Sequence, residues 1–424
     1  MKRGLISQMK NNAIDNIWLI VGLTVASLAI WFFGSSLFTI LRYRFLPLGF
    51  DAENVFVFDI ERIYNESPEF IGTGEDFEVI YSEDLKSLIR RLRESPNVEA
   101  AAFSRNGGLP YADGFDSKKL FLPKGNDTLV YFGHEREMSP EMVKVLRLQS
   151  RTGKDADYLQ KKLEQGDMLV SNVYVYPDWT EGTAYAKDIN GQYPLRMSFN
   201  EDMDEVFVKT HIADEIEIIR MNGYDYPPGG TIIVPIDEKA VLPWVYNVVV
   251  RVKPGCAGKF YDEFMATREM RQQRNVSLYN MQALSDRGRD IERSADLDVR
   301  LYSVFIVFML IIIFLGLLGT FWFRIQQRVG EIAIRRVCGA SRFDIFRRLL
   351  GESMVLLFCA SGLTAIIGWV AIHKLDFNDK FTTGELIWLE VATMALVAIG
   401  IVLSILGPAW MAMRINPAEA VKDE

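Results

Sequence analysis

Four long apolar runs constrain this chain more than any other feature of its sequence. They contain no Asp, Glu, Lys, Arg or His, and they extend over Ile17 to Leu41, Leu301 to Phe323, Ser353 to Ile372 and Val391 to Met413. Each reaches the roughly 20 residues that an α-helix needs to cross the hydrocarbon core of a bilayer. A buried helix of a soluble protein could explain one such run, but not four. The sequence therefore predicts an α-helical membrane protein with four transmembrane helices.

The first run could instead be a cleaved signal peptide, because Lys2, Arg3 and Lys10 precede it. However, it is longer than the roughly 7–15-residue apolar region of such peptides, and no Ala-x-Ala cleavage site follows. We therefore expect a retained anchor, preceded by a short amphipathic cytoplasmic segment over residues 1–16.

Basic residues predict the orientation of the four spans. The loop 324–352 is rich in arginine, whereas the loop 373–390 is mainly acidic. The positive-inside rule places the arginine-rich loop and both chain ends in the cytoplasm, and residues 42–300 and 373–390 outside. The long exterior segment is more acidic than the whole chain, whose net charge is −8. Such a segment is a poor partner for nucleic acid or anionic lipid.

The exterior segment has the pattern of a mixed α and β domain. "NVFVFDI" (Asn54 to Ile60) predicts a strand, "SEDLKSLIRRLRESP" a helix capped by Ser82, and "VEAAAFS" a second strand, which gives a βαβ-like unit. "YNVVVRVKPG" and "CAGKFYDEFMATREMRQQ" predict a later strand and helix. Turn signals indicate a strand-rich insertion between the two pairs, which suggests two subdomains. A charged helix over residues 281–300 is expected to lead directly into the second span as a stalk.

Sites for catalysis, cofactors and metals are not indicated. "GCAGKF" (Gly255 to Phe260) lacks the spacing and the final Ser or Thr of a phosphate loop, and a strand-to-helix turn explains it better. The three histidines, His134, His211 and His373, lack ligand-like spacing. The four apolar runs contain no ionisable group for an ion or proton relay, which disfavours secondary transport. The exterior segment has a single cysteine, Cys256, so no disulfide is expected within it.

The arginine-rich loop reads "RVGEIAIRRVCGASRFDIFRRLLGES" from Arg328 to Ser353. Its first half predicts an amphipathic helix that ends at Gly339 and Ala340. Ser341, followed three residues later by Asp344, predicts the N-cap of a second amphipathic helix. Such a hairpin could lie on the inner lipid surface or form a docking element for a cytoplasmic protein, and its periodicity alone does not separate these alternatives.

This loop resembles the signature of the FtsX-like, MacB-type permeases of ABC transporters. The resemblance rests on "R-x-x-E-I-x-I-R-R-x-x-G-A-S" from Arg328 to Ser341, and on the tail "PAWMAMRINPAEAVKDE", in which Arg414, Asn416, Pro417, Ala418 and Glu419 match. "MSPEMVKVLRLQSRTGKD" resembles the family's exterior domain more loosely. One span, a large exterior domain and three further spans are also the family's layout.

The apolar runs, the sequence pattern and the resemblance together imply a domain organisation for the whole chain. It comprises a cytoplasmic segment 1–16, a first span 17–41, an extracytoplasmic domain 42–300, spans at 301–323, 353–372 and 391–413, and a cytoplasmic tail 414–424. Within the extracytoplasmic domain, a porter-like subdomain (about 54–130 and 240–280) is interrupted by a strand-rich insertion, 131–239, and followed by the stalk, 281–300. The chain would be a bacterial inner-membrane protein with this large domain in the periplasm.

The resemblance also implies a non-catalytic subunit that acts by mechanotransmission. A separate cytoplasmic ATPase would bind ATP and Mg²⁺, and its hydrolysis cycle would move the exterior domain through the stalk. The chain itself would then hold no cofactor or metal. The hairpin would be the coupling interface to that ATPase, with contacts from Glu331, Ile332, Ile334, Arg335, Arg336, Gly339, Ala340, Ser341, Arg342 and Phe346. Two copies, or this chain and a related permease, would pair in the membrane, and a periplasmic adaptor with an outer-membrane channel could be further partners.

Other interpretations remain open at this stage. An ATP-independent membrane sensor or scaffold would need no docking hairpin. Within the resemblance, lipoprotein extraction, efflux and control of cell-wall hydrolases all use the same architecture, and the acidic exterior would suit a cationic cargo. Small residues in the spans indicate close helix packing, either within one subunit or across a dimer seam, at Gly316, Gly319, Gly362, Gly368 and Gly400.

Overall fold

The computed structural model describes residues 13–64, 66–73, 76–105, 107–111, 116–124, 127–171, 195–198, 206–208, 212–224, 230–237, 245, 247–327, 330, 334, 338–339, 341–374 and 383–412. The chain divides into two compact units. The helical unit comprises Met1–Arg42 with Ala295–Glu424, and the sheet unit comprises Tyr43–Ser294.

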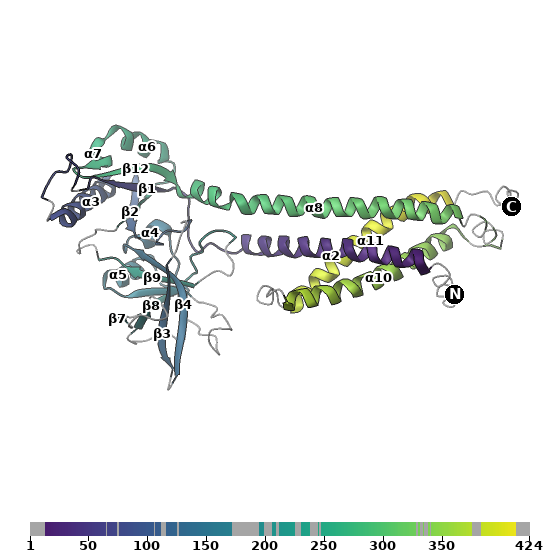
Figure 1. Cartoon of the computed structure of the whole chain (residues 1–424). Helices are drawn as coiled ribbons and strands as arrows, with labels where there is room; N and C mark the ends of the chain where they lie inside the picture. The colour runs from purple at the N-terminus through teal and green to yellow at the C-terminus, as the bar shows by residue number, and fades with distance from the viewer. Residues whose placement is uncertain are drawn as a thin grey trace. The chain divides into compact units, whose positions relative to one another are not determined.

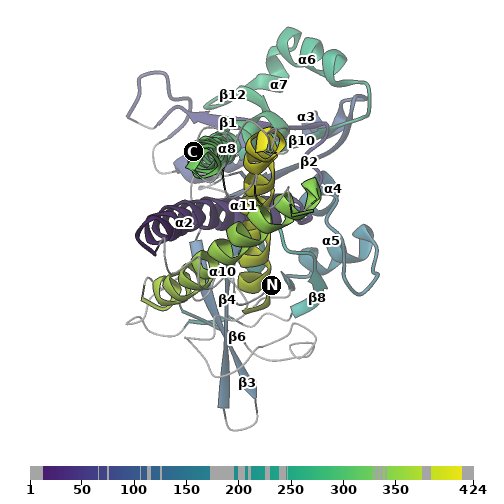
Figure 2. The ribbon, with the colours of Figure 1, turned by 90° about the vertical axis from the view of Figure 1, so that its right-hand side faces the viewer.

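Four long helices contain the apolar runs (Figures 1 and 2): α2 (Ala13–Arg44), α8 (Leu284–Gln327), α10 (Arg342–Lys374) and α11 (Thr383–Ala412). Within them, the candidate membrane spans are Ile17–Arg44, Leu284–Gln327, Leu350–Ala371 and Gly384–Pro408, by length and composition. This confirms the four expected membrane helices among the described residues.

The helical unit has a narrow core and an apolar exterior. Ile30 of α2, Ala360 of α10 and Ile401 of α11 are at most 1% exposed and belong to one cluster that also includes Leu317 of α8. On the same helices, large apolar side chains such as Trp18 (73% exposed) and Phe323 (62% exposed) face outward. So much exposed apolar area would be costly in water, so this surface suits lipid.

The fourth span begins earlier than its apolar run suggested. Helix α11 starts at Thr383, and its candidate span includes Glu385 and Glu390. The charge-free run begins after both carboxylates, at Val391. The two carboxylates therefore lie in the first turns of α11, ahead of its apolar stretch. Pro408 lies inside α11 and does not end it.

Two split βαβ units, one from each end of the sheet unit, build a four-stranded part of its sheet. They are β1 (Val55–Arg62), α3 (Phe77–Glu94) and β2 (Val98–Ser104), then β10 (Asn247–Val252), α6 (Ala257–Ala266) and β12 (Val276–Ala283). The strand order is β12-β1-β10-β2, and all neighbours are antiparallel. Each unit therefore inserts a strand of the other between its own two strands, which is ferredoxin-like topology.

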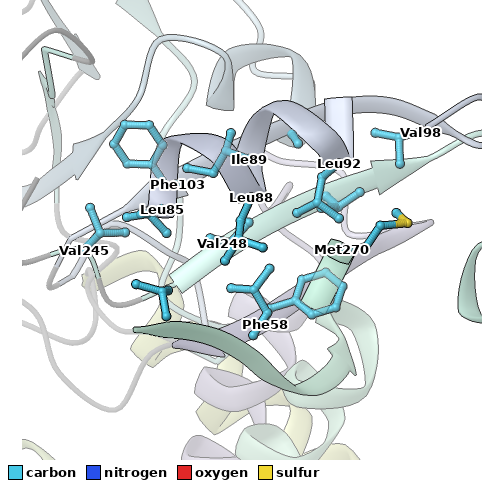
Figure 3. Packing of buried hydrophobic residues seen from close by; sticks show 14 of the residues in the cluster. Phe58, Leu85, Leu88, Ile89, Leu92, Val98, Phe103, Val245, Val248 and Met270 are labelled. Atoms are coloured by element: carbon cyan, nitrogen blue, oxygen red, sulfur yellow. The ribbon is translucent and has the colours of Figure 1, made fainter. Parts of the chain in front are cut away.

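Both faces of this sheet are buried, which explains its nearly continuous apolar strands. In β1, Phe58 belongs to the cluster under α3 and α6, whereas Val55 and Val57 belong to the cluster on the opposite face. Figure 3 shows the α3 side chains close to Phe58 and Val248. One face of α3 is apolar and buried, since four of its side chains are at most 2% exposed: Leu85, Leu88, Ile89 and Leu92.

The same sheet continues into the strand-rich part of the unit. β2 meets β4 (Asp127–Met138) at Ser104, and β4 pairs antiparallel with β3 (Asp116–Lys124) and parallel with β9 (Gly230–Pro235). The remaining elements of this part are α4 (Met142–Leu146), α5 (Ala156–Glu164), β5 (Met168–Ser171), β6 (Leu195–Ser198), β7 (Val206–Val208) and β8 (Ile212–Ile216).

Three local expectations need correction. Ser82 is not an N-cap, because α3 begins more than a turn earlier, at Phe77, and buries Ser82 in its interior. The expected late helix is interrupted at Thr267. The chain then forms the short helix α7 (Arg268–Arg271) and the strand β11 (Gln272–Gln273), which pairs with β12. The stalk helix begins at Leu284, because β12 occupies the preceding residues up to Ala283.

Candidate functional site

The turn of the arginine-rich loop is held in a backbone conformation that requires glycine. Gly339 has φ +94°, a value that L side chains rarely adopt. Just before it, the amide of Cys338 donates to the carbonyl of Ile334 at 3.0 Å, which is a helical i→i−4 bond. The first half of the loop therefore ends in helical geometry at the expected glycine.

The second helix of the loop begins with a reciprocal cap. Ser341 Oγ accepts from the amide of Asp344 at 3.2 Å, and the Asp344 carboxylate accepts from the amide of Ser341 at 3.0 Å and from its hydroxyl at 2.6 Å. The predicted N-cap at Ser341 is confirmed, with Asp344 in the place of the glutamate of a capping box. Hydrogen bonds from the Ser341 side chain and amide lower the pKa of Asp344. The cap is therefore intact above the usual range of an aspartate pKa and weakens as the pH falls through the lowered value.

Apolar side chains near the turn are open to solvent. Ile334 is 55% exposed and Phe343 is 67% exposed. Exposed apolar groups beside a fixed turn can bind another surface but cannot perform bond chemistry. The backbone of Arg342 and Phe346 belongs to α10, but their side chains lie outside what the structure describes. The same holds for the whole of five predicted contact residues: Glu331, Ile332, Arg335, Arg336 and Ala340.

The five predicted packing glycines differ in their surroundings. A Cβ at Gly368 would lie 3.5 Å from the Trp31 ring of α2, and a Cβ at Gly400 would lie 4.0 Å from Ile313 of α8. These two glycines pack against neighbouring helices of the same chain. Gly316, Gly319 and Gly362 have no atom within 4 Å of an added Cβ in the part of the chain that the structure describes.

Further contacts between membrane helices were not anticipated from the sequence. Phe33 of α2 stacks on Phe305 of α8, with ring centroids 4.9 Å apart. Arg42 of α2 forms an ion pair with Glu385 of α11. The sequence did not predict this ion pair, because residues 373–390 were expected to form a loop. Thr383, two residues before Glu385, was the one local sign that a helix could begin there.

The sheet unit provides no cluster for metal binding among its described residues. No group of three or more His, Cys, Asp or Glu side chains converges there. His134 is buried, and desolvation together with the charge of Arg136 lowers its pKa to about 4. It is therefore neutral near pH 7.

Three buried arginines in the sheet unit were not identified from the sequence. Arg136, Arg220 and Arg251 are at most 2% exposed. Each donates to backbone carbonyls, and Arg251 also pairs with the carboxylate of Asp51 at 3.2 Å. A single sequence gives no sign of such partners, because every residue type has a carbonyl.

These features define a class: a multi-span membrane protein with a large sheet domain between its first two spans and a capped helical turn between its second and third. Residues 303–417, which include this turn, match the family model of the FtsX-like permease C-terminal domain. The match supports an FtsX-like ABC permease. No curated protein matches it.

The match also indicates a general role for the chain. FtsX-like permeases are inner-membrane subunits of ABC transporters, typically non-catalytic, and they generally pair with a cytoplasmic ABC ATPase. The match covers the three C-terminal membrane helices and the turn between the first two of them.

Proposed function

We propose that this chain converts ATP hydrolysis by a separate cytoplasmic ATPase into movement of its sheet unit, and that it acts in efflux or in the handling of lipoproteins and the cell envelope. In this arrangement the sheet unit lies in the periplasm and both chain ends lie in the cytoplasm, as the arginine-rich loop predicts. ATP and Mg²⁺ are bound by the partner. The cargo, a periplasmic adaptor with its channel, and a second permease copy complete the assembly.

The capped turn at Gly339–Ser341, inside the family match, carries this proposal. A helix that only lies on lipid needs no left-handed glycine and no reciprocal cap at one fixed place. A docking element does, because a partner must meet the same surface each time. The exposed Ile334 and Phe343 beside the turn supply apolar area for such contact.

Co-purification from native membranes tests the proposal. The tagged wild type is compared with a triple variant of the loop, Glu331→Lys, Arg335→Glu and Arg336→Glu, after both are shown to insert equally. An ATP-binding protein should accompany the wild type and be lost from the variant, because the charges that face it are reversed. A matched control makes the same charge changes on the exposed surface of the sheet unit: Lys154→Glu, Lys161→Glu and Glu164→Lys.

The control should retain the ATPase. If the ATPase is lost from the control as well, the effect is one of net charge and not of the loop. If no ATPase accompanies the wild type, the chain acts without ATP, and the sensor or scaffold interpretation takes the place of this proposal.

A further inference from the structure

Residues 219–224 of the sheet unit, called here the clasp segment, contact the ends of two membrane helices at once. Residues Tyr43 and Arg44 at the end of α2 and residues 284–294 at the start of α8 belong to the sheet unit. The clasp segment is the part of the chain between β8 and β9 that touches both of these helix ends.

Arg220 holds the end of α2. Its Nη1 donates to the carbonyls of Tyr43 at 2.7 Å and Leu46 at 3.2 Å, and its amide donates to the carbonyl of Leu48 at 3.0 Å. The last carbonyls of a helix lack partners within the helix and carry its negative partial charge. A buried guanidinium therefore caps α2 both electrostatically and by hydrogen bonds, and Arg220 is only 2% exposed.

The same segment holds the start of α8. The amide of Gly223 donates to the carboxylate of Glu292 at 2.6 Å. The carbonyl of Met221 accepts from the amide of Tyr111 at 2.8 Å, and the carbonyl of Tyr111 accepts from Arg287 of α8 at 2.7 Å. The Tyr111 ring lies against Gly288, where an added Cβ would come within 2.6 Å of it.

The sheet anchors the other side of the clasp segment. Arg136 of β4, fully buried, donates to the carbonyl of Ile219 at 2.9 Å. Thr231 of β9 accepts from the amide of Ile219 at 3.0 Å through its hydroxyl. Both bonds are buried, so their loss would leave polar groups unsatisfied. The segment is therefore hydrogen-bonded to the sheet on one side and to the ends of two helices on the other.

We propose that the clasp segment is the junction through which movement of α2 and α8 reaches the sheet, and that Arg220 and Glu292 are its positioning residues. Arg220 transmits displacement of α2 to β4 through Ile219 and Arg136, and Glu292 transmits displacement of α8 through Gly223. This inference rests on the proposed function and assigns residues to it.

Distances between two labels in the complex with the partner ATPase test the proposal. The labels are placed at the exposed Glu164 of α5 and Asp298 of α8, in a chain whose three cysteines are replaced by serine. In the wild type, a non-hydrolysable ATP analogue with Mg²⁺ should shift the distance. In Arg220→Gln that shift should fall by more than half, while the ATPase rate of the complex is retained.

Arg251→Gln is the matched control, because Arg251 is also buried and also donates to backbone carbonyls, of Val145, Glu53 and Asp51. Neither α2 nor α8 contributes any of these carbonyls. If Arg220 serves only stability, the two variants lose the nucleotide-dependent shift equally, and that outcome overturns the proposal.

A second pair of variants tests the α8 side without removing a buried charge. Glu292→Ala removes the acceptor for the Gly223 amide and should reduce the shift, whereas Glu292→Gln keeps an acceptor oxygen and should restore it. A full shift in both R220Q and E292A overturns the proposal. If the wild type itself shows no change in label distance with nucleotide, the proposed function fails. If the wild type shows the change and the variants keep it, only the role of the clasp segment is contradicted.

Discussion

His134 on β4 is a buried, neutral histidine, and protonating it in acid would destabilise the folded chain. Its pKa is lowered to about 4 in the folded chain, against about 6.5 when unfolded. Between these two values the unfolded chain binds the extra proton, so the free energy of unfolding falls as the pH falls, by about 1.4 kcal/mol per pH unit. Above pH 6.5 the histidine is neutral in both states, and its protonation no longer lowers the free energy of unfolding.

We therefore expect the thermal unfolding temperature of the sheet unit, measured in the full chain, to be lower at pH 5 than at pH 7. In His134→Gln, which has no group to protonate, the difference between the two pH values should shrink. An equally large difference in this variant would assign the acid sensitivity to other groups.

Gly339 offers a second prediction for a single residue. Its φ of +94° means that a side chain at this position strains the turn, typically by 1 kcal/mol or more. We expect Gly339→Val to reduce the amount of ATPase that co-purifies with the chain. Gly351→Ala is the control, since Gly351 lies inside α10 with no atom within 4 Å of an added Cβ. Equal recovery of ATPase with both variants would contradict a role for the turn.

Helix α3 depends on one buried face. Leu88 is fully buried between α3 and the sheet, so Leu88→Ala should cost about 2–5 kcal/mol. Arg90, exposed on the same helix, provides the control, and Arg90→Ala should change stability by no more than about 0.5 kcal/mol. Amide hydrogen exchange in β1 and β10 of the full chain measures both effects, and equal exchange in the two variants would contradict the packing described for α3.

Periodic patterns predicted elements well and their ends poorly. The apolar face of α3 was visible in the spacing of its leucines. Its start was not, because the first turns of α3 pack against residues outside the helix: Arg62 of β1 lies over the Tyr81 ring at 4.3 Å, and Tyr64 stacks on Phe77. These contacts join distant parts of the chain, and local propensity has no information about them. The cap at Ser341 was predictable because both of its partners lie within four residues.

At the scale of the whole molecule, features set by local sequence were likewise predictable, and features set by distant contacts were not. Four charge-free runs predicted four membrane helices, since lipid imposes its requirement on each segment separately. The strand order of the sheet was not predictable, because β1 pairs with β10 some two hundred residues along the chain. The clasp is an extreme case: Arg220 and Tyr43 are 177 residues apart, and the acceptor is a main-chain carbonyl.

Helix α8 is continuous from Leu284 to Gln327, and Gly288 near its start fits only without a side chain. The direction in which each side chain points around the helix axis is therefore fixed relative to every other residue of α8. One residue inserted between Gly288 and the apolar stretch would turn everything beyond it by about 100°, whereas seven residues would change the phase by only about 20°. Length variation in this part of related chains should accordingly occur in steps of whole helical turns, and single insertions or deletions should be rare there.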